Sequence, residues 1–303
     1  MKKLVIATRR SRLALWQAEH VGQRLAAAHR GLAVELLPMT TRGDELLDAR
    51  LDQAGGKGLF IKELEQALAD GKADIAVHSM KDLPADLPPG FTVAAILERE
   101  DPRDAFVSNT FNEIKNLPQR AVVGTSSLRR AAQILERYPS LEAKLLRGNV
   151  ETRLAKLDRG EYDAVILAVA GLLRLGLRNR IRARLDPEDS LPAPGQGALG
   201  VECLDSRADL KQLLQFMDHA PTAACIRAER AVSRALGGSC TLPLGAYAQV
   251  DGVKLHLRAL VASPDGRRVA RANGTGDDPE RLGAEVAGRL RALGAEDILR
   301  ALA

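Results

Sequence analysis

The residues best suited to chemistry are Lys81 and Asp82, which follow a short apolar run in the first third of the chain. That run, residues 75–77, predicts a buried strand, and in an open α/β sheet the loop after a strand is where ligands bind. The stretch therefore brings a hydroxyl (Ser79), a cation and a carboxylate to one loop. An isolated Lys–Asp pair is more often only a solvated turn, so its meaning depends on the rest of the chain.

Hydroxyl and arginine side chains gather near two similar junctions between a strand and a helix. Residues 3–7 predict a strand followed by a helix over 13–28, and residues 121–123 begin the same order again. Backbone N–H groups and the helix dipole favour an anion at such junctions. Arg9, Ser11, Ser127, Arg129 and Arg130 lie at these junctions, and the second lobe adds Arg147, Arg153 and Arg174. Each charge-assisted hydrogen bond contributes roughly 1.5–3 kcal/mol, so this set predicts a ligand with several carboxylates or phosphates.

Asp82 differs from these residues in charge. A carboxylate among arginines does not bind an anion, and we expect it to stabilise a cation or to transfer a proton. His78 also invites a catalytic role, but its place at the end of a buried strand fits a core or supporting side chain better.

A repeat in the sequence predicts an α/β fold with two similar lobes. Residues 71–77 and 160–166 share the same pattern, and each follows an amphipathic helix. Two such lobes would place their strand-end loops across a cleft, joined by linkers at 98–104 and 191–198. After residue 220 the pattern changes to strands at 246–250, 253–261 and 267–272 and a closing helix at 279–293, which predicts a small α+β domain.

These patterns give three predicted domains. Domain 1 is an α/β lobe formed by residues 1–98 and 198–216, domain 2 is the second lobe at 103–192, and domain 3 is the α+β domain at 220–303.

Composition excludes several classes of protein. The chain has 303 residues, a net charge of +5 and 3% aromatic residues, which is too little of either charge or aromatic surface to favour nucleic acid binding. No apolar run approaches the roughly 18 residues of a membrane span, and the charged N-terminus is unlike a signal peptide, so we expect a cytoplasmic protein.

The three cysteines are far apart and predict neither a disulfide framework nor a zinc site. Cys203 and Cys225 fit the role of inert buried thiols. A buried thiol is also the commoner role for a lone cysteine such as Cys240, but Cys240 follows two glycines in a loop that could bring its sulfur close to another domain.

Several motifs, in one order and over nearly the whole chain, resemble the porphobilinogen deaminase (hydroxymethylbilane synthase) family. They are IATRRSRLALWQA, GGKGLFIKELE, ADIAVHSMKDLP, GTSSLRR, LRGNVETRL, LPAPGQGAL and GGSC. The resemblance implies three domains, of which the first two are similar to type II periplasmic binding proteins. It also implies a transferase of heme biosynthesis that links four porphobilinogen units into 1-hydroxymethylbilane with release of ammonia.

The resemblance further implies roles for individual residues. Cys240 matches the cysteine that carries a dipyrromethane cofactor through a thioether, and Asp82 matches the carboxylate that assists loss of the aminomethyl nitrogen and stabilises the resulting cations. The positions that match contacts to the cofactor or to the acetate and propionate groups of the pyrroles are Arg9, Ser11, Lys81, Ser127, Arg129, Arg130, Arg147, Gly148, Arg153, Arg174 and Gln196. Phe60 could cover the growing chain, and Gln53 stands where many bacterial members have a lysine.

Two other functions stay open from the sequence alone. A non-enzymatic anion-binding protein of the two-lobed class would bind its ligand reversibly and would have an unmodified mass. A regulator that binds nucleic acid through the helix of Arg129 and Arg130 would show strong salt dependence. For the enzyme, the family suggests a monomer that needs no metal and passes its product to the next tetrapyrrole enzyme.

Overall fold

The computed structural model describes residues 2–41, 43, 61–237 and 242–302. These residues form two compact units, the first made of residues 1–100 and 198–223 and the second of residues 101–197 and 224–303. The predicted third domain falls, from residue 224 onward, in the same unit as the predicted second domain.

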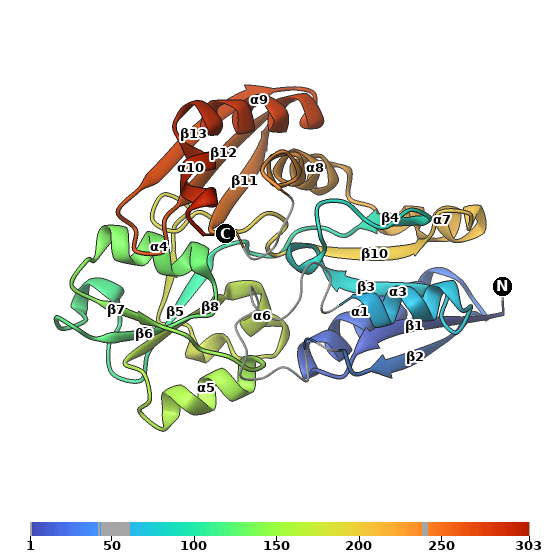
Figure 1. Cartoon of the computed structure of the whole chain (residues 1–303). Coiled ribbons are helices and arrows are strands. Elements are labelled where there is room, and N and C mark those ends of the chain that lie inside the picture. Colours follow the sequence, from blue (N-terminus) through green and yellow to red (C-terminus); the bar gives the residue numbers. More distant parts are fainter. Residues whose placement is uncertain (1, 42, 44–60, 238–241, 303) are drawn as a thin grey trace. The chain divides into compact units, whose positions relative to one another are not determined.

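The first unit is built on a five-stranded sheet in the order β2-β1-β3-β10-β4 (Figure 1). Its strands are β1 (Lys3–Arg9), β2 (Ala33–Met39), β3 (Ile75–Ser79), β4 (Phe91–Ile96) and β10 (Leu199–Leu204). Its helices are α1 (Arg12–Ala28), α3 (Lys62–Ala69) and α7 (Ala208–Leu214), with short 3-10 turns η1 (Met80–Asp82) and η4 (Gln215–Met217). β1, β2 and β3 are parallel, and β10 returns antiparallel to β3.

Helices cover both faces of this sheet, as the apolar strands predict. Ile75 and Val77 of β3 pack in a cluster with side chains of α1 and α7, whereas Ala76 packs on the other face with Leu64 and Leu68 of α3. Because successive strand residues point to opposite faces, a strand buried on both sides is a continuous apolar run rather than an alternating one. This explains why the short run at 75–77 could be assigned from sequence.

The second unit contains a five-stranded sheet with the same arrangement, in the order β7-β6-β8-β5-β9. Its strands are β5 (Asp104–Val107), β6 (Val122–Gly124), β7 (Glu142–Lys144), β8 (Ala164–Ala168) and β9 (Ala183–Leu185). Its helices are α4 (Leu128–Arg137), α5 (Val150–Asp158) and α6 (Val169–Arg174), with 3-10 turns η2 (Ile114–Asn116) and η3 (Arg178–Arg180). β6, β7 and β8 are parallel, and β5 is antiparallel to β8 and β9.

The sequence repeat therefore corresponds to a structural repeat. In each sheet three parallel strands lie side by side, with β3 or β8 in the centre of the sheet. The next strand, β10 or β5, is antiparallel to this central strand, and the edge strand, β4 or β9, is antiparallel to β10 or β5. One expectation was wrong: the passage at 98–104 is not linker throughout, because Asp104 opens β5 and is fully buried.

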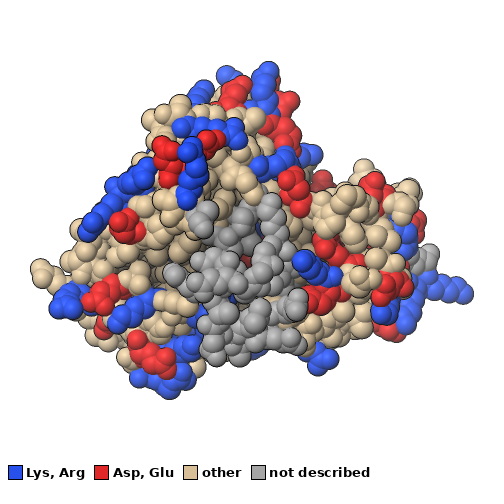
Figure 2. All heavy atoms as spheres, in the orientation of Figure 1, with Lys and Arg blue, Asp and Glu red and all other residues tan. Residues whose placement is uncertain are grey.

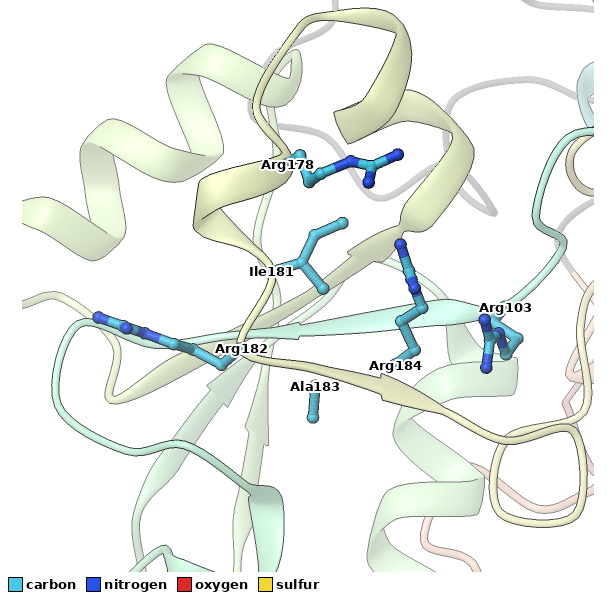
Figure 3. A pocket seen from close by; sticks show the side chains of 6 residues that line it. All are labelled: Arg103, Arg178, Ile181, Arg182, Ala183 and Arg184. Atoms are coloured by element: carbon cyan, nitrogen blue, oxygen red, sulfur yellow. The ribbon is translucent and has the colours of Figure 1, made fainter.

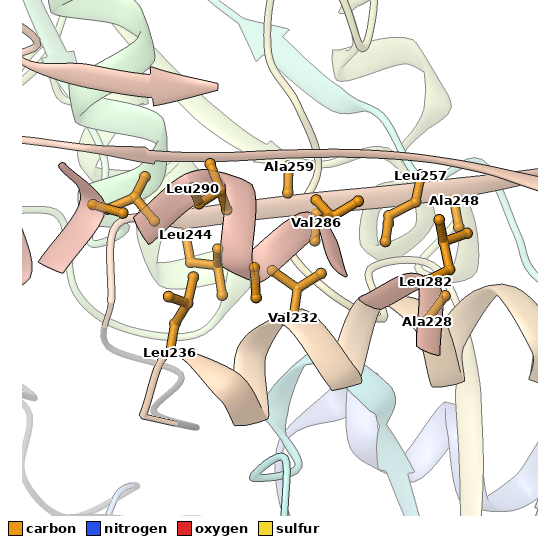
Figure 4. Close-up of a cluster of buried hydrophobic side chains, with 14 of the residues drawn as sticks. Ala228, Val232, Leu236, Leu244, Ala248, Leu257, Ala259, Leu282, Val286 and Leu290 are labelled. Atoms are coloured by element: carbon orange, nitrogen blue, oxygen red, sulfur yellow. The ribbon is translucent and has the colours of Figure 1, made fainter. Parts of the chain in front are cut away.

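The second unit also contains a three-stranded antiparallel sheet, β11-β12-β13. Its elements are β11 (Leu244–Asp251), β12 (Lys254–Ala262), β13 (Val269–Gly276), α9 (Pro279–Ala292), α10 (Ala295–Arg300) and α8 (Ala220–Ala235), which begins within the first unit. Side chains of α8 and α9, such as Val232 and Val286, pack against Leu257 and Ala259 of the sheet (Figure 4). The opposite face contacts α4 through Ala132 and Leu260. This α+β arrangement agrees with the predicted fold.

Candidate functional site

Four of the predicted site residues lie at one edge of the first sheet. β1 and β3 are parallel neighbours, with Ile6 opposite Ile75, so their carboxyl ends meet at the same edge. Arg9 is the last residue of β1, and Lys81 and Asp82 lie in η1 directly after β3. The fold thus collects cations and one carboxylate at the edge where α/β sheets bind ligands.

Ser11 belongs to the same edge and begins α1. Its Oγ accepts a hydrogen bond of 3.3 Å from the backbone N–H of Ala14, which caps the helix. The hydroxyl hydrogen can still be donated, so Ser11 can cap the helix and offer a donor to an anion at the same time.

Backbone contacts hold the η1 turn that carries Lys81 and Asp82. The N–H of Met80 donates to the carbonyl of Ala198 over 3.0 Å, and that of Leu83 donates to Met80 over 3.3 Å. Just before the turn, Gln17 Nε2 donates to Ser79 Oγ over 2.9 Å. Lys81 and Asp82 are only half-buried, so their charged groups are held in place and still accessible.

A second set of predicted residues follows the parallel strands of the second sheet. Ser127 lies after β6 and caps α4 by accepting from the N–H of Arg130 over 3.4 Å. Arg147 follows β7, and Arg174 ends α6, which follows β8. Since these three strands are parallel neighbours, the side chains lie at the carboxyl edge of one sheet.

Arg129 and Arg130 are held by a carboxylate that sequence reasoning missed. Asp104 accepts hydrogen bonds from Arg129 at 2.8 and 3.2 Å and from Arg130 at 2.9 Å, and a second nitrogen of Arg130 lies 2.7 Å from it. Ser190 Oγ and Gln196 Nε2 also donate to it, over 2.8 and 2.9 Å. All five side chains are buried.

The charges of this cluster determine how Asp104 ionises. Burial alone would raise the pKa of Asp104, but the charges of Arg129 and Arg130 outweigh it and hold that pKa far below its usual value. Asp104 therefore stays ionised and anchors the two guanidinium groups. The signal in the sequence was an acid immediately before the apolar run 105–107, where a buried carboxylate would need a basic partner.

The remaining predicted residues of the second unit are Gly148 and Gln196, which lie in loops, and Arg153, which lies in α5. Gly148 has φ +112°, a left-handed conformation that favours glycine, and its carbonyl accepts from Arg153 Nε over 2.7 Å. Arg174 donates to the carbonyl of Gly197 over 2.6 Å, next to the buried Gln196. These contacts orient Arg153 and Arg174 relative to the backbone.

A hollow of about 390 Å³ lies elsewhere in the second unit and contains none of the predicted site residues. It is lined by Ile181, Ala183 and the arginines Arg103, Arg178, Arg182 and Arg184 (Figure 3). Asp101 pairs with two of these arginines, Arg103 and Arg184.

Two of the three cysteines, Cys203 and Cys225, lie among the described residues. Cys203 and Cys225 are buried, and burial raises the pKa of Cys203 to about 11, so it stays a thiol at neutral pH. This agrees with the inert role expected for both. Cys240, Phe60 and Gln53 lie outside the described residues, so their predicted roles stay predictions.

The described part of the chain has neither a metal cluster nor a membrane-spanning helix. No group of three or more His, Cys, Asp or Glu side chains there could hold a metal ion. None of its helices combines the length and apolar character needed to span a membrane. On the face drawn in Figure 2, Lys and Arg side chains lie among Asp and Glu.

Similarity to solved structures is weak. The aliphatic sulphonate binding protein from Escherichia coli covers 77% of this chain and 70% of its own, with 12% identity and a TM-score of 0.43. A nutrient binding protein from Burkholderia cenocepacia bound to methionine covers 70% of this chain and 90% of its own, with 15% identity and a TM-score of 0.43.

Similarity in sequence is much stronger. Residues 4–212 match the family model described as porphobilinogen deaminase, dipyromethane cofactor binding domain, and residues 223–292 match that of the porphobilinogen deaminase C-terminal domain. The porphobilinogen deaminase of Bordetella parapertussis is 59% identical over 100% of this chain and 97% of its own length. That of Chromobacterium violaceum is 57% identical over 100% and 98%. The resemblance seen in the motifs thus extends along the whole sequence, and the chain belongs to the porphobilinogen deaminase family.

Proposed function

We propose that the chain joins four porphobilinogen molecules head to tail into 1-hydroxymethylbilane and releases ammonia, as a transferase of heme biosynthesis. The observation that carries this function is the position of Asp82, a half-buried carboxylate held at the same sheet edge as Arg9 and Lys81. Cations there suit the two carboxylates of each pyrrole, and one carboxylate suits a reaction that passes through cationic carbon.

The dipyrromethane cofactor supplies a primer to which the pyrrole units are added, and Cys240 would carry it through a thioether. The donors that the structure describes fit such an acidic group, since they combine guanidinium, ammonium and hydroxyl groups at sheet edges. In this proposal the cofactor is held by Lys81, Asp82, Ser127, Arg129, Arg130 and Gly148, and the substrate by Arg9, Ser11, Phe60, Arg147, Arg153, Arg174 and Gln196.

Asp82 would act at two points of each addition. When the aminomethyl nitrogen of porphobilinogen leaves as ammonia, the carbon it leaves becomes cationic, and the carboxylate stabilises that charge. After the new carbon–carbon bond forms, the ring carbon must lose its proton, and the same carboxylate can accept it. No other predicted site residue is a carboxylate, so the other residues would bind and orient.

Intact-protein mass spectrometry tests the cofactor assignment. We expect the purified protein to be heavier than its sequence by one dipyrromethane, and Cys240→Ser to have the unmodified mass. Cys203→Ala is the matched control and should keep the added mass, because Cys203 is buried in the first sheet. Active protein with an unmodified mass would refute the assignment, and a loaded Cys240→Ser variant would move the attachment to another cysteine.

The proposal also includes a setting for this activity. The protein would work in the cytoplasm as a monomer, without nucleic acid or membrane, and would pass its product to the next tetrapyrrole enzyme. A net charge of +5 with 3% aromatic residues supports the absence of a nucleic acid partner. Light scattering on the purified protein tests the monomer.

A further inference from the structure

Three ionisable side chains lie buried in the first unit, close in sequence or space to the η1 turn. His78 is 6% exposed, Glu65 is 9% exposed and Glu202 is fully buried. None of them belongs to the predicted site. Charged groups are costly to bury, so their presence beside the turn that carries Asp82 calls for a role.

The core of this group is an ion pair between His78 and Glu202 on neighbouring strands. β3 and β10 are antiparallel, with Gly200 opposite His78 and Glu202 opposite Ala76. Glu202 is therefore a diagonal neighbour of His78 on the same face of the sheet. His78 Nε2 lies 2.8 Å from Glu202 Oε2, while Glu202 Oε1 is buried and makes no hydrogen bond to the described residues.

Glu65 adds a second carboxylate to this face. It lies on α3, which contacts β3 and β10. Burial, and then the negative charge of Glu202, raise the pKa of Glu65 to about 7, against opposing effects of His78 and Lys62. Glu202 contacts the imidazole of His78, and Glu65 is close enough to both for their charges to affect its pKa. Buried ion pairs seldom add net stability over apolar packing, but they can select one arrangement of the chain.

The ion pair lies where β3 passes into η1. His78 precedes the last residue of β3, and Met80 begins the turn that ends at Asp82. Met80 packs directly over Gly200, because a Cβ at Gly200 would lie 2.2 Å from Met80 Sδ and Met80 would have to move. Met80 thus packs against β10 at Gly200, the residue that is paired with His78. The N–H of Met80 also donates to the carbonyl of Ala198, which lies just before β10. A change in the spacing of β3 and β10 here would displace η1.

We propose that His78 and Glu202 are positioning residues for Asp82: their buried ion pair sets the approach of β3 to β10 and thereby the place of the catalytic carboxylate. This inference rests on the proposed function. A displacement of about 1 Å at a reacting group can lower a rate by about 100-fold. Loss of the pair should therefore lower kcat more than it changes KM.

The main test replaces both members of the pair together. His78→Leu alone would leave Glu202 buried without its partner and could unfold the protein, whereas His78→Leu with Glu202→Met replaces the pair by apolar groups. We expect this double variant to keep its thermal midpoint and its cofactor mass, and to lose about tenfold or more in kcat with KM nearly unchanged. A double variant with wild-type kcat would overturn the inference.

A second variant and a control separate positioning from general damage. His78→Gln keeps a donor that can reach Glu202, and it should recover most of the lost kcat; a His78→Gln variant as slow as the double variant would also overturn the inference. His29→Leu removes another hydrogen-bonded histidine of the same unit, whose Nε2 lies 3.1 Å from the carbonyl of Leu213, and it should leave kcat unchanged. An active Asp82→Ala variant would instead refute the proposed function, which these histidine variants do not test.

Discussion

Replacing Asp104 with asparagine tests the buried cluster that anchors Arg129 and Arg130. The carboxylate receives three hydrogen bonds of 2.8 to 3.2 Å from the two guanidinium groups, and Arg130 makes a further ion-pair contact of 2.7 Å with it. Asparagine keeps one acceptor oxygen, presents N–H donors on the other side, and leaves two buried arginines without a counter-charge. Breaking a buried ion pair by removing one partner costs about 3–5 kcal/mol.

The expected loss is large relative to the whole stability of a protein. A loss of about 4 kcal/mol corresponds to a fall in the thermal midpoint of about 6 °C for a chain of this size. Differential scanning calorimetry at neutral pH measures it, and substrate turnover measured well below the transition tests the proposed role of Arg129 and Arg130 in binding the cofactor. We expect weaker cofactor retention or a higher KM, because the guanidinium groups lose the acceptor that orients them.

Asp189→Asn is the matched control for this experiment. Asp189 also pairs with an arginine of α4, Arg137, but both side chains are nearly half exposed, with exposed fractions of 47% and 46%. Ion pairs in water contribute about 0–1 kcal/mol, so the thermal midpoint should hardly move. If Asp104→Asn destabilised the protein no more than Asp189→Asn does, the cluster would not be an anchor and our reasoning would be wrong.

Three further substitutions follow from the structure. Because the pKa of Glu65 rises on folding from 4.5 to about 7, the contribution of Glu65 to stability is fully present below pH 4.5 and is lost as the pH rises through 7; Glu65→Gln should remove this loss, roughly 1–3 kcal/mol after solvent screening, in urea unfolding at pH 5 and pH 8. Asp82→Ala should leave the circular dichroism spectrum intact and abolish nearly all turnover, and wild-type rates would refute its role. Gly148→Ala should cost about 1–3 kcal/mol in the same unfolding assay, because φ is +112° and the new Cβ would lie 2.7 Å from Thr152 Cγ2; an unchanged midpoint would contradict this.

Much of the fold was predictable because its apolar pattern is local. The helix expected at 13–28 is α1 (Arg12–Ala28), and the closing helix expected at 279–293 is α9 (Pro279–Ala292). The repeat at 71–77 and 160–166 locates β3 and β8, the central strands of two sheets with one strand order. In each case the residues that decide the structure are neighbours in sequence, so one stretch contains the information.

The short strands of the second sheet were not predicted, for a physical reason. β7 and β9 have three residues each and contain charged side chains, Glu142 and Lys144 in one and Arg184 in the other. They are edge strands, whose partners lie far away in sequence. A strand of this kind forms because the neighbouring strand of the sheet provides its hydrogen bonds. Its own amino-acid composition does little to predict a strand.

The candidate site was predictable to a similar degree. Arg9, Lys81 and Asp82 were identified by their positions at or after the ends of predicted strands. Parallel strands bring their carboxyl ends together, so this prediction did not depend on the structure of the loops. Asp104 was missed because its role depends on arginines 25 and 26 residues away in sequence. The partners of a buried carboxylate that are distant in sequence can be identified only from the folded structure.

The two sheets share one strand order, yet the described carboxylates at their edges are suited to different tasks. In the second sheet Asp104, at the start of the antiparallel strand, is fully buried between two arginines, and its depressed pKa keeps it from taking up a proton at neutral pH. In the first sheet Asp82 follows the central strand and is only half-buried. The repeated fold thus supplies two acids, and their surroundings make one an anchor for arginines and leave the other accessible to substrate. Since a proton acceptor must be able to exchange protons, this contrast favours Asp82 as the acid that reacts.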